Sequence, residues 1–273
     1  MHSRTDELRV APGEPARLAD RDPGLRSGAA DKQTGLAKLQ DIVGRLGILH
    51  DRLQAEGTRS LLLVLQGMDA SGKDGTIRNV LSGVNPQGCR IVSFREPSAT
   101  ELAHDFLWRI HAACPARGEL AIFNRSHYED VVAVRVRNIA PEPVWRPRFV
   151  SIRAFEKSLV HEGTAIVKVF LHVSREEQRK RLQERLDNPE KRWKFRAGDL
   201  DDRARWDDFA AAYEEAISET STECAPWYIV PADHNWVRNL AVAEILVEAL
   251  EHLDPRLPQA DAGLDALEGL EVR

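Results

Sequence analysis

The sequence has few cysteines, no excess of basic residues and no long apolar run. Cys89, Cys114 and Cys224 lie far apart without a C-x-x-C pair, a pattern that indicates neither a zinc site nor a disulfide framework and fits a reducing cytoplasm. The formal net charge is -5 at pH 7, whereas nucleic-acid-binding domains are usually basic overall. We therefore expect no nucleic-acid partner, and we expect any anion site to be a local groove.

Apolar runs stay well short of the ~20 residues that cross a bilayer, and the N-terminus is charged within its first residues. We expect neither a membrane span nor a signal peptide, no membrane partner, and a cytoplasmic location. With 273 residues, 42% of them hydrophobic, the chain has enough apolar material for one large domain.

Composition divides the chain into three parts. Residues 1–33 are rich in Arg, Asp, Gly, Pro and Ala without apolar periodicity, which predicts an extended N-terminal arm that lacks a core of its own. Residues 34–255 carry the strand and helix patterns of one domain, and residues 256–273 form a weakly patterned C-terminal tail. The arm and the tail are expected at the surface of that domain.

Buried strands are predicted where apolar runs are followed by helical patterns, from Leu61 to Gly67 and over 89–94, 119–123, 165–173 and 227–230. The alternation predicts an α/β fold of three layers, with a five-stranded parallel sheet, helices on both faces and right-handed crossovers. Helices are predicted over 36–55, 77–81, 98–113, 131–137, 149–160, 174–186, 202–218 and 236–252.

The first strand leads into Gly67-x-x-x-x-Gly72-Lys73, a pattern typical of a loop that holds phosphate against the N-terminus of a helix. Lys73 should contact the transferred or adjacent phosphate. The residues expected to surround the phosphates are Gly67, Ala70, Ser71, Gly72, Lys73, Asp74, Gly75 and Thr76.

Two acids in this loop need an explanation. Asp69 would repel phosphate unless a cation neutralises it, so it is a candidate ligand for Mg²⁺; the alternative is that it bonds its own loop amides. Asp74 occupies the place of the usual Ser or Thr, and it either favours the helix dipole or binds metal.

The third strand ends in Asn124, Arg125, Ser126, His127, Tyr128, Glu129 and Asp130. Side chains that act on substrate collect at such strand ends, and we expect Asn124, His127, Tyr128, Glu129 and Asp130 to bind nucleotide. Arg125 could grip phosphate through two N–H groups or form a surface ion pair. Glu129 and Asp130 could orient a ribose or a metal, or cap the next helix. His127 is better interpreted as structural than as a nucleophile.

A basic stretch lies between Gln178 and Arg196, with eight cations against three acids. Its charges continue past the helix-breaking Pro189, and Trp193 and Phe195 stand among them, which favours a mobile lid at about 187–205 over a solvated helix face. Such a surplus of cations suits a donor with a long run of negative charges. The cations expected on that donor are Arg185, Lys191 and Lys194.

Five motifs together resemble polyphosphate kinase family 2: 67–75 (GMDASGKDG), 123–130 (FNRSHYED), 188–195 (NPEKRWKF), 206–209 (WDDF) and 225–233 (APWYIVPAD). The resemblance covers roughly residues 35–255. It implies a thymidylate-kinase-like P-loop fold with a helical lid, and Mg²⁺-dependent phosphoryl transfer between inorganic polyphosphate and a nucleotide.

By motif position, the resemblance assigns catalysis to Asp69, Lys73 and Arg125, with Mg²⁺ on Asp69. Asn124 followed by His-Tyr-Glu-Asp is similar to the class III subgroup, whose members accept AMP as well as ADP. Adenine nucleotides, with guanine nucleotides as a further option, are the expected partners, and the family suggests a homo-oligomer.

The hypothesis is a reversible polyphosphate:AMP/ADP phosphotransferase. An ATP-dependent nucleoside monophosphate kinase is the alternative among enzymes. A P-loop module that binds nucleotide or polyphosphate without turnover is the alternative from another class.

Overall fold

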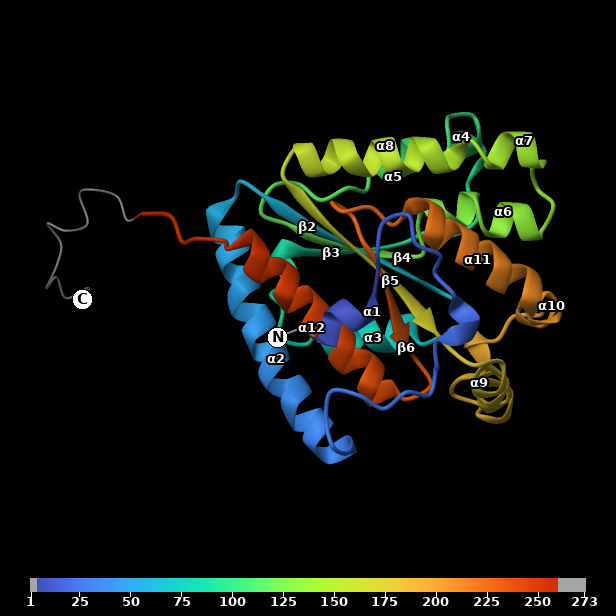
Figure 1. Cartoon of the computed structure of the whole chain (residues 1–273), viewed down its shortest axis with the longest axis horizontal. Helices are drawn as coiled ribbons and strands as arrows, with labels where there is room; N and C mark the ends of the chain where they lie inside the picture. Colours follow the sequence, from blue (N-terminus) through green and yellow to red (C-terminus); the bar gives the residue numbers. More distant parts are fainter. Residues whose placement is uncertain (1–3, 260–273) are drawn as a thin grey trace, which may run out of the picture.

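A computed structural model describes residues 4–259. Its centre is one sheet with the strand order β1-β6-β5-β2-β4-β3, covered by helices on both faces (Figure 1). The strands are β1 (Arg9–Val10), β2 (Ser60–Gly67), β3 (Cys89–Ser93), β4 (Leu120–Asn124), β5 (Thr164–His172) and β6 (Trp227–Pro231).

The strands β2 to β6 are all parallel to their neighbours, as the alternation of strand and helix patterns predicted. Each begins and ends within about two residues of its expected range. Every residue of β2 is buried, which explains why its sequence is a continuous apolar run and not an alternating one.

The expected count of five strands was wrong, because the N-terminal segment adds β1 antiparallel to β6. This strand pairs only Arg9 with Tyr228 and Val10 with Trp227, so it is too short for an apolar alternation to reveal it. Around it, Leu8, Val10, Ala16 and Leu18 are buried in the common core. The described part of the arm is therefore packed on the domain.

One face of the sheet is covered by α12 (Asn235–Leu253), which packs against β5 and β6 and also against α2 (Lys32–Glu56) and α3 (Lys73–Val80). The opposite face carries α8 (Arg148–His161), which packs on β5, with α11 (Trp206–Thr220) and α6 (Ala133–Val136) beside it (Figure 1). The two helical layers confirm the three-layer α/β architecture.

Two of the predicted helices are each divided in two. The 98–113 segment forms α4 (Ala99–Leu102) and α5 (Trp108–His111), because Asp105 bonds the Leu107 amide and turns the chain between them. The capping box at Ser98 is present. The 202–218 segment is divided between α10 (Gly198–Ala204) and α11.

The basic stretch comprises α9 (Arg175–Asp187), the short η4 (Arg192–Lys194) and α10. Shorter elements complete the chain: α1 (Arg4–Leu8), η1 (Leu18–Asp20), η2 (Pro86–Gly88), η3 (His127–Asp130) and α7 (Glu142–Trp145). Within residues 4–259, no helix is both long enough and apolar enough to span a bilayer.

Candidate active site

The site lies where the neighbouring strands β2 and β4 end. Leu65 of β2 is in register with Asn124 of β4, so the P-loop that follows β2 and the polar segment that follows β4 emerge side by side. The carboxyl edge of a parallel sheet is where ligands bind in open α/β folds. The topology thus brings together residues about 60 positions apart in sequence.

Glycines at both ends of the P-loop, residues 67–76, allow its tight path. Gly67 has φ 151° and Gly72 has φ 104°, in the region that glycine adopts at little cost. A Cβ on Gly67 would lie 2.7 Å from Ser71 Oγ, so close packing also requires glycine there. Helix α3 begins at Lys73, and its first N–H groups therefore face the loop.

Lys73 bends back over the loop that precedes it. Its Nζ donates to Gly67 O over 2.7 Å and to Met68 O over 3.2 Å. Burial, together with the nearby Arg125 charge, lowers the pKa of Lys73 to about 8, although Asp69 and Glu129 oppose the shift. A phosphate bound in the loop would replace these carbonyl contacts and favour the charged ammonium.

Asp69 and Arg125 form the closest charge pair of the site, with Arg125 Nη2 2.6 Å from Asp69 Oδ1. Arg125 also lies 3.9 Å from Glu129. Burial alone would raise the pKa of Asp69, but Arg125 and Lys73 outweigh it and lower that pKa. Glu129 and then Asp69 raise the pKa of Arg125 against the effect of burial. Asp69 and Arg125 are therefore both charged at neutral pH.

Asp74, which the sequence left between two interpretations, has a partner in the structure. Its Oδ1 accepts from Asn124 Nδ2 over 2.9 Å. It also lies in the first turn of α3, where a carboxylate is favourable. Asp74 thus ties the end of β4 to the start of the P-loop helix.

Asp130 is a half-buried acid held by two arginines. Arg148 Nη1 donates to the Asp130 carbonyl oxygen over 2.8 Å, and Arg109 Nη2 lies 3.8 Å from Asp130 Oδ2. Burial raises the pKa of Asp130, while the two arginines counteract that shift. Among residues 4–259, no group donates a hydrogen bond to its buried Oδ2.

His127 and Tyr128 lie beneath the site and not in it. They are 0% and 1% exposed, and both point to Glu156 of α8, with Tyr128 Oη 2.8 Å from Glu156 Oε1. Lys168 of β5 joins this cluster, its Nζ 2.6 Å from Glu156 Oε2. A nucleotide cannot touch His127 or Tyr128 in this conformation. Of the expected nucleotide-binding segment, Asn124, Glu129 and Asp130 remain at the site.

Only some of the cations of the basic stretch lie near the P-loop. Arg185 is near enough to contribute to the lowered pKa of Asp69, and its Nη1 lies 3.5 Å from Asp199 Oδ2. Lys191 is paired with Glu184, and Lys194 Nζ lies 5.1 Å from the ring centroid of the exposed Trp193. Neither lysine contacts a P-loop residue.

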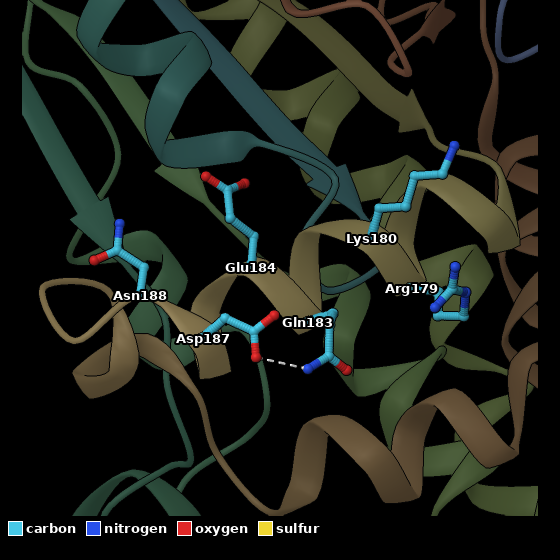
Figure 2. A pocket seen from close by; sticks show the side chains of 6 residues that line it. All are labelled: Arg179, Lys180, Gln183, Glu184, Asp187 and Asn188. Atoms are coloured by element: carbon cyan, nitrogen blue, oxygen red, sulfur yellow. Dashed lines mark hydrogen bonds between the residues drawn. The ribbon is translucent and has the colours of Figure 1, made fainter.

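A shallow hollow of about 460 Å³ follows α9 and the residue after it. Figure 2 shows Lys180 and Glu184 on one side of the helix and Gln183, which donates to Asp187 over 2.8 Å, on the other. None of the residues that line this hollow belongs to the P-loop. They are Arg179, Lys180, Gln183, Glu184, Asp187 and Asn188.

Three residues that sequence reasoning did not select hold the P-loop from behind. Gln178 Nε2 donates to Asp69 O over 3.0 Å, and Arg181 donates to two carbonyls of the loop. Arg238, from the distant helix α12, donates to Ser71 O over 3.3 Å. In the sequence, Arg181 is one of the eight cations of the basic stretch, and nothing distinguishes it from the others. Arg238 lies in an apolar helix, outside any motif.

Asp69 is the residue of this site best suited to a magnesium ion. Mg²⁺ is usually held by one or two carboxylates together with substrate phosphates. Asp69 is part of the phosphate loop, and its side chain is 16% exposed. Residues 4–259 contain no cluster of three His, Cys, Asp or Glu side chains arranged around a common point. The donor set therefore fits a metal that phosphate oxygens help to hold.

Comparison with known proteins agrees with the geometry. The protein family described as Polyphosphate kinase 2 (PPK2) matches residues 29–258. The chain belongs to the polyphosphate kinase 2 family.

Similar proteins cover nearly the whole chain. A polyphosphate kinase 2 crystal structure from Arthrobacter aurescens TC1 superposes with a TM-score of 0.94 at 42% identity, covering 98% of this chain and 96% of that one. An AMP/ADP-polyphosphate phosphotransferase of Meiothermus ruber is 55% identical, with 96% of this chain and 98% of the relative aligned. An ADP-polyphosphate phosphotransferase of Rhodopseudomonas palustris is 45% identical over 95% of this chain and 94% of its own length.

The comparisons confirm the resemblance to polyphosphate kinase family 2 on which the sequence-based hypothesis rested. They also support kinase chemistry on polyphosphate and a nucleotide over the two alternatives.

Proposed function

We propose that this member of the polyphosphate kinase 2 family transfers a phosphoryl group reversibly between inorganic polyphosphate and AMP or ADP, with Mg²⁺. The observation that carries the proposal is the meeting of Lys73, Arg125 and Asp69 at one sheet edge, with Arg125 Nη2 2.6 Å from Asp69 Oδ1. A phosphate chain needs several fixed positive groups, and Mg²⁺ bridging carboxylate and phosphate oxygens gives a use to the acid among them.

Transfer needs no covalent intermediate on the protein. The first N–H groups of α3 and the Lys73 ammonium would hold the phosphate oxygens, and Arg125 would neutralise charge on the moving phosphoryl group. Asp69 and the phosphates would hold Mg²⁺, which when bound supplies charge neutralisation between neighbouring phosphate oxygens. The carboxylate of Asp69 would then exchange its pairing with Arg125 for the metal, which frees Arg125 for phosphate.

The acceptor nucleotide would approach from the side of Asn124, Glu129 and Asp130. Glu129 lies 3.9 Å from Arg125, and Asp130 is the next residue of the same segment, so this side of the site offers acids to an acceptor beside the phosphate-binding arginine. We propose adenine nucleotides as acceptors, with guanine nucleotides to be tested beside them. The names of the two curated relatives, which include AMP/ADP and ADP, support this range.

We further propose that the fold is thymidylate-kinase-like and that residues 187–205 act as a lid. Trp193, at 77% exposed, supports this proposal, because its ring is free to stack on a ligand when the segment closes. Arg185, Lys191 and Lys194 would leave their present partners and meet the polyphosphate on closure.

The test is to incubate the purified chain with Mg²⁺, long-chain polyphosphate and either AMP or ADP, and to measure ATP. We expect ATP from ADP, and from AMP through two transfers. Lys73→Ala should abolish it, and Arg45→Met, on the exposed face of α2, should not. Formation of a diphosphate only when ATP replaces polyphosphate would establish a nucleoside monophosphate kinase. Binding of polyphosphate without any product would establish a binding module.

A further inference from the structure

Two guanidinium groups meet on a single carbonyl oxygen behind the P-loop. Arg181 Nη1 donates to Ser71 O over 3.1 Å, and Arg238 Nη1 donates to the same oxygen over 3.3 Å. Arg181 comes from α9 and Arg238 from α12, so two helices that lie far apart in sequence converge on one peptide unit.

The two arginines differ in how their charge is balanced. Arg181 is paired with Glu177 of its own helix, Nε to Oε1 2.9 Å. Arg238 is 2% exposed, and its side-chain partners are the neutral amide oxygens of Asn235 and Asn239, at 2.8 and 3.2 Å. Within the described part of the chain, Arg238 has no carboxylate partner.

The charge of Arg238 persists at neutral pH. Burial, and after it the neighbouring Arg181, lowers the pKa of Arg238 to about 9. A buried cation without an acid close to it is costly, because the surroundings do not replace the water that it has lost. An anion bound on the other side of the loop would offset that cost.

Peptide geometry connects the arginines to that other side. In a trans peptide, the C=O and N–H bonds point in opposite directions, so the Gly72 N–H points away from the guanidiniums that bind Ser71 O. Among residues 4–259, the Gly72 N–H has no acceptor. Hydrogen bonds to a carbonyl also polarise the peptide and make its N–H a stronger donor.

The identity of residue 72 follows from the same contact. A Cβ on Gly72 would lie 2.0 Å from Arg238 Nη1, well inside van der Waals contact. Only glycine therefore lets the guanidinium approach this peptide, in addition to the need for φ 104°.

We propose that Arg238 and Arg181 are positioning residues that act through the Ser71–Gly72 peptide: they aim its N–H at the phosphate chain, and the phosphate chain in turn neutralises the unpaired Arg238. The proposal rests on the proposed function only in taking an inorganic phosphate chain as the anion in the P-loop.

The test compares binding and stability in the full chain. Arg238→Met should weaken binding of inorganic tripolyphosphate, measured by calorimetry, about tenfold, because opposite charges on the two sides of one peptide unit still interact strongly at a buried site. The melting temperature of the free variant should equal or exceed that of the wild type. If Arg238 had only a structural role, Arg238→Met would give the reverse result, with a lower melting temperature and unchanged affinity. An affinity within twofold of the wild type would overturn the proposal.

Two further variants separate charge from structure. Arg238→Lys should be compared with the wild type at pH 6, because the burial that lowers the arginine pKa to about 9 would bring the pKa of a lysine there near neutrality. At that pH it keeps a buried cation and should retain affinity within about threefold; if it binds as weakly as Arg238→Met there, the charge is not the cause. Arg181→Met, at a side chain already paired with Glu177, should weaken binding about threefold and serves if Arg238→Met does not fold. Arg45→Met makes the same change in net charge at the surface and should alter neither property.

The same protein samples should be assayed for ATP formation from polyphosphate and ADP. A wild type that binds tripolyphosphate but forms no ATP would contradict the proposed function and leave the role of Arg238 standing. A wild type that forms ATP, beside an Arg238→Met variant that binds tripolyphosphate normally, would contradict only the role of Arg238.

Discussion

Asn124 donates a hydrogen bond from its side-chain amide to Asp74 Oδ1 over 2.9 Å. This bond joins the end of β4 to the first turn of α3, the two segments between which the phosphates are expected to lie. An amide at 124 and an acid at 74 are complementary, whereas two acids there would repel each other. The two positions should therefore depend on each other.

Exchanging the two groups tests that dependence. Asn124→Asp alone should destabilise the protein by about 0.5–1 kcal/mol, because like charges then meet at a partly exposed position. Adding Asp74→Asn restores one acid and one amide and should recover most of the loss. Urea unfolding of the wild type, Asn124→Asp, Asp74→Asn and the double variant gives the coupling energy between the two positions.

Independent, additive effects of the two substitutions would contradict this coupling. Activity supplies a second measurement, since Asn124→Asp adds a carboxylate near the phosphates. We expect its ratio of ADP to AMP use to rise, and an unchanged ratio would contradict that expectation.

Asp69→Asn should lower the rate of phosphoryl transfer by about 10²–10³-fold at saturating Mg²⁺, because a neutral amide is a poor magnesium ligand and no longer pairs with Arg125. The measurement is ATP formation across a magnesium titration, in which the half-saturating concentration should also rise. Asp51→Asn, on an exposed position of α2, is the matched control. A variant with wild-type dependence on Mg²⁺ would remove Asp69 from the metal site.

Lys73 should make anion binding sensitive to pH. With its pKa lowered to about 8, the free lysine is about one quarter protonated at pH 8.5. Bound phosphate favours the ammonium and raises its pKa, so binding should take up about 0.7 proton at that pH, and affinity should fall as pH rises from 8 to 10. Calorimetry of tripolyphosphate in buffers of different ionisation enthalpy measures the uptake.

Lys73→Arg is the control for this uptake, since its guanidinium stays protonated throughout that range. The wild type should take up more protons than Lys73→Arg, while any titration of the ligand itself is common to both. Equal uptake by the two proteins would show that Lys73 keeps its proton when free.

The strands and the P-loop were predictable because their signals are local. The run from Leu61 to Gly67 is apolar at every position but two, and the glycine spacing after it fixes the loop. The short β1 was missed because two residues cannot show a period, and its pairing depends on β6, more than 200 residues further on. Local patterns do not report such distant partners.

The residues of the candidate site likewise include some that local motifs predict and others that only distant packing places. Asp69, Lys73 and Arg125 stand in motifs, and the structure brings them together. His127 lies in the same motif as Arg125 but points into the core, because the turn of η3 directs its side chain to Glu156. Arg238 was not found because only the packing of α12 against α3 places it behind the loop.

Arg185, one of the cations expected on the polyphosphate donor, is held by an acid of the following α-helix, with Nη1 3.5 Å from Asp199 Oδ2. Asp199→Asn should release it and tighten polyphosphate binding about twofold to fivefold, since one competing charge is removed at a buried position. The measurement is the KM for polyphosphate, with Asp201→Asn, exposed on the same helix, as the control. An unchanged or higher KM would mean that Arg185 does not reach the donor.

The buried pair of Lys168 and Glu156 provides the last prediction. Lys168 Nζ lies 2.6 Å from Glu156 Oε2, and neither side chain is more than 2% exposed. Lys168→Met leaves a buried carboxylate without its cation and should cost about 3–5 kcal/mol in the free energy of unfolding, whereas Lys168→Met with Glu156→Met should recover most of that loss. Urea unfolding measures both, with Arg135→Met at the half-exposed pair with Glu215 as a control expected to cost less than about 1 kcal/mol.

A double variant as unstable as the single one would show that shape, and not charge balance, holds this cluster. The distinction matters at the active site, because Glu156 also accepts from Tyr128 Oη over 2.8 Å. Tyr128 lies three residues after Arg125, in the segment that leaves β4. If charge balance holds the cluster, Lys168→Met should also lower the rate of transfer by loosening Arg125, and the double variant should restore stability and rate together.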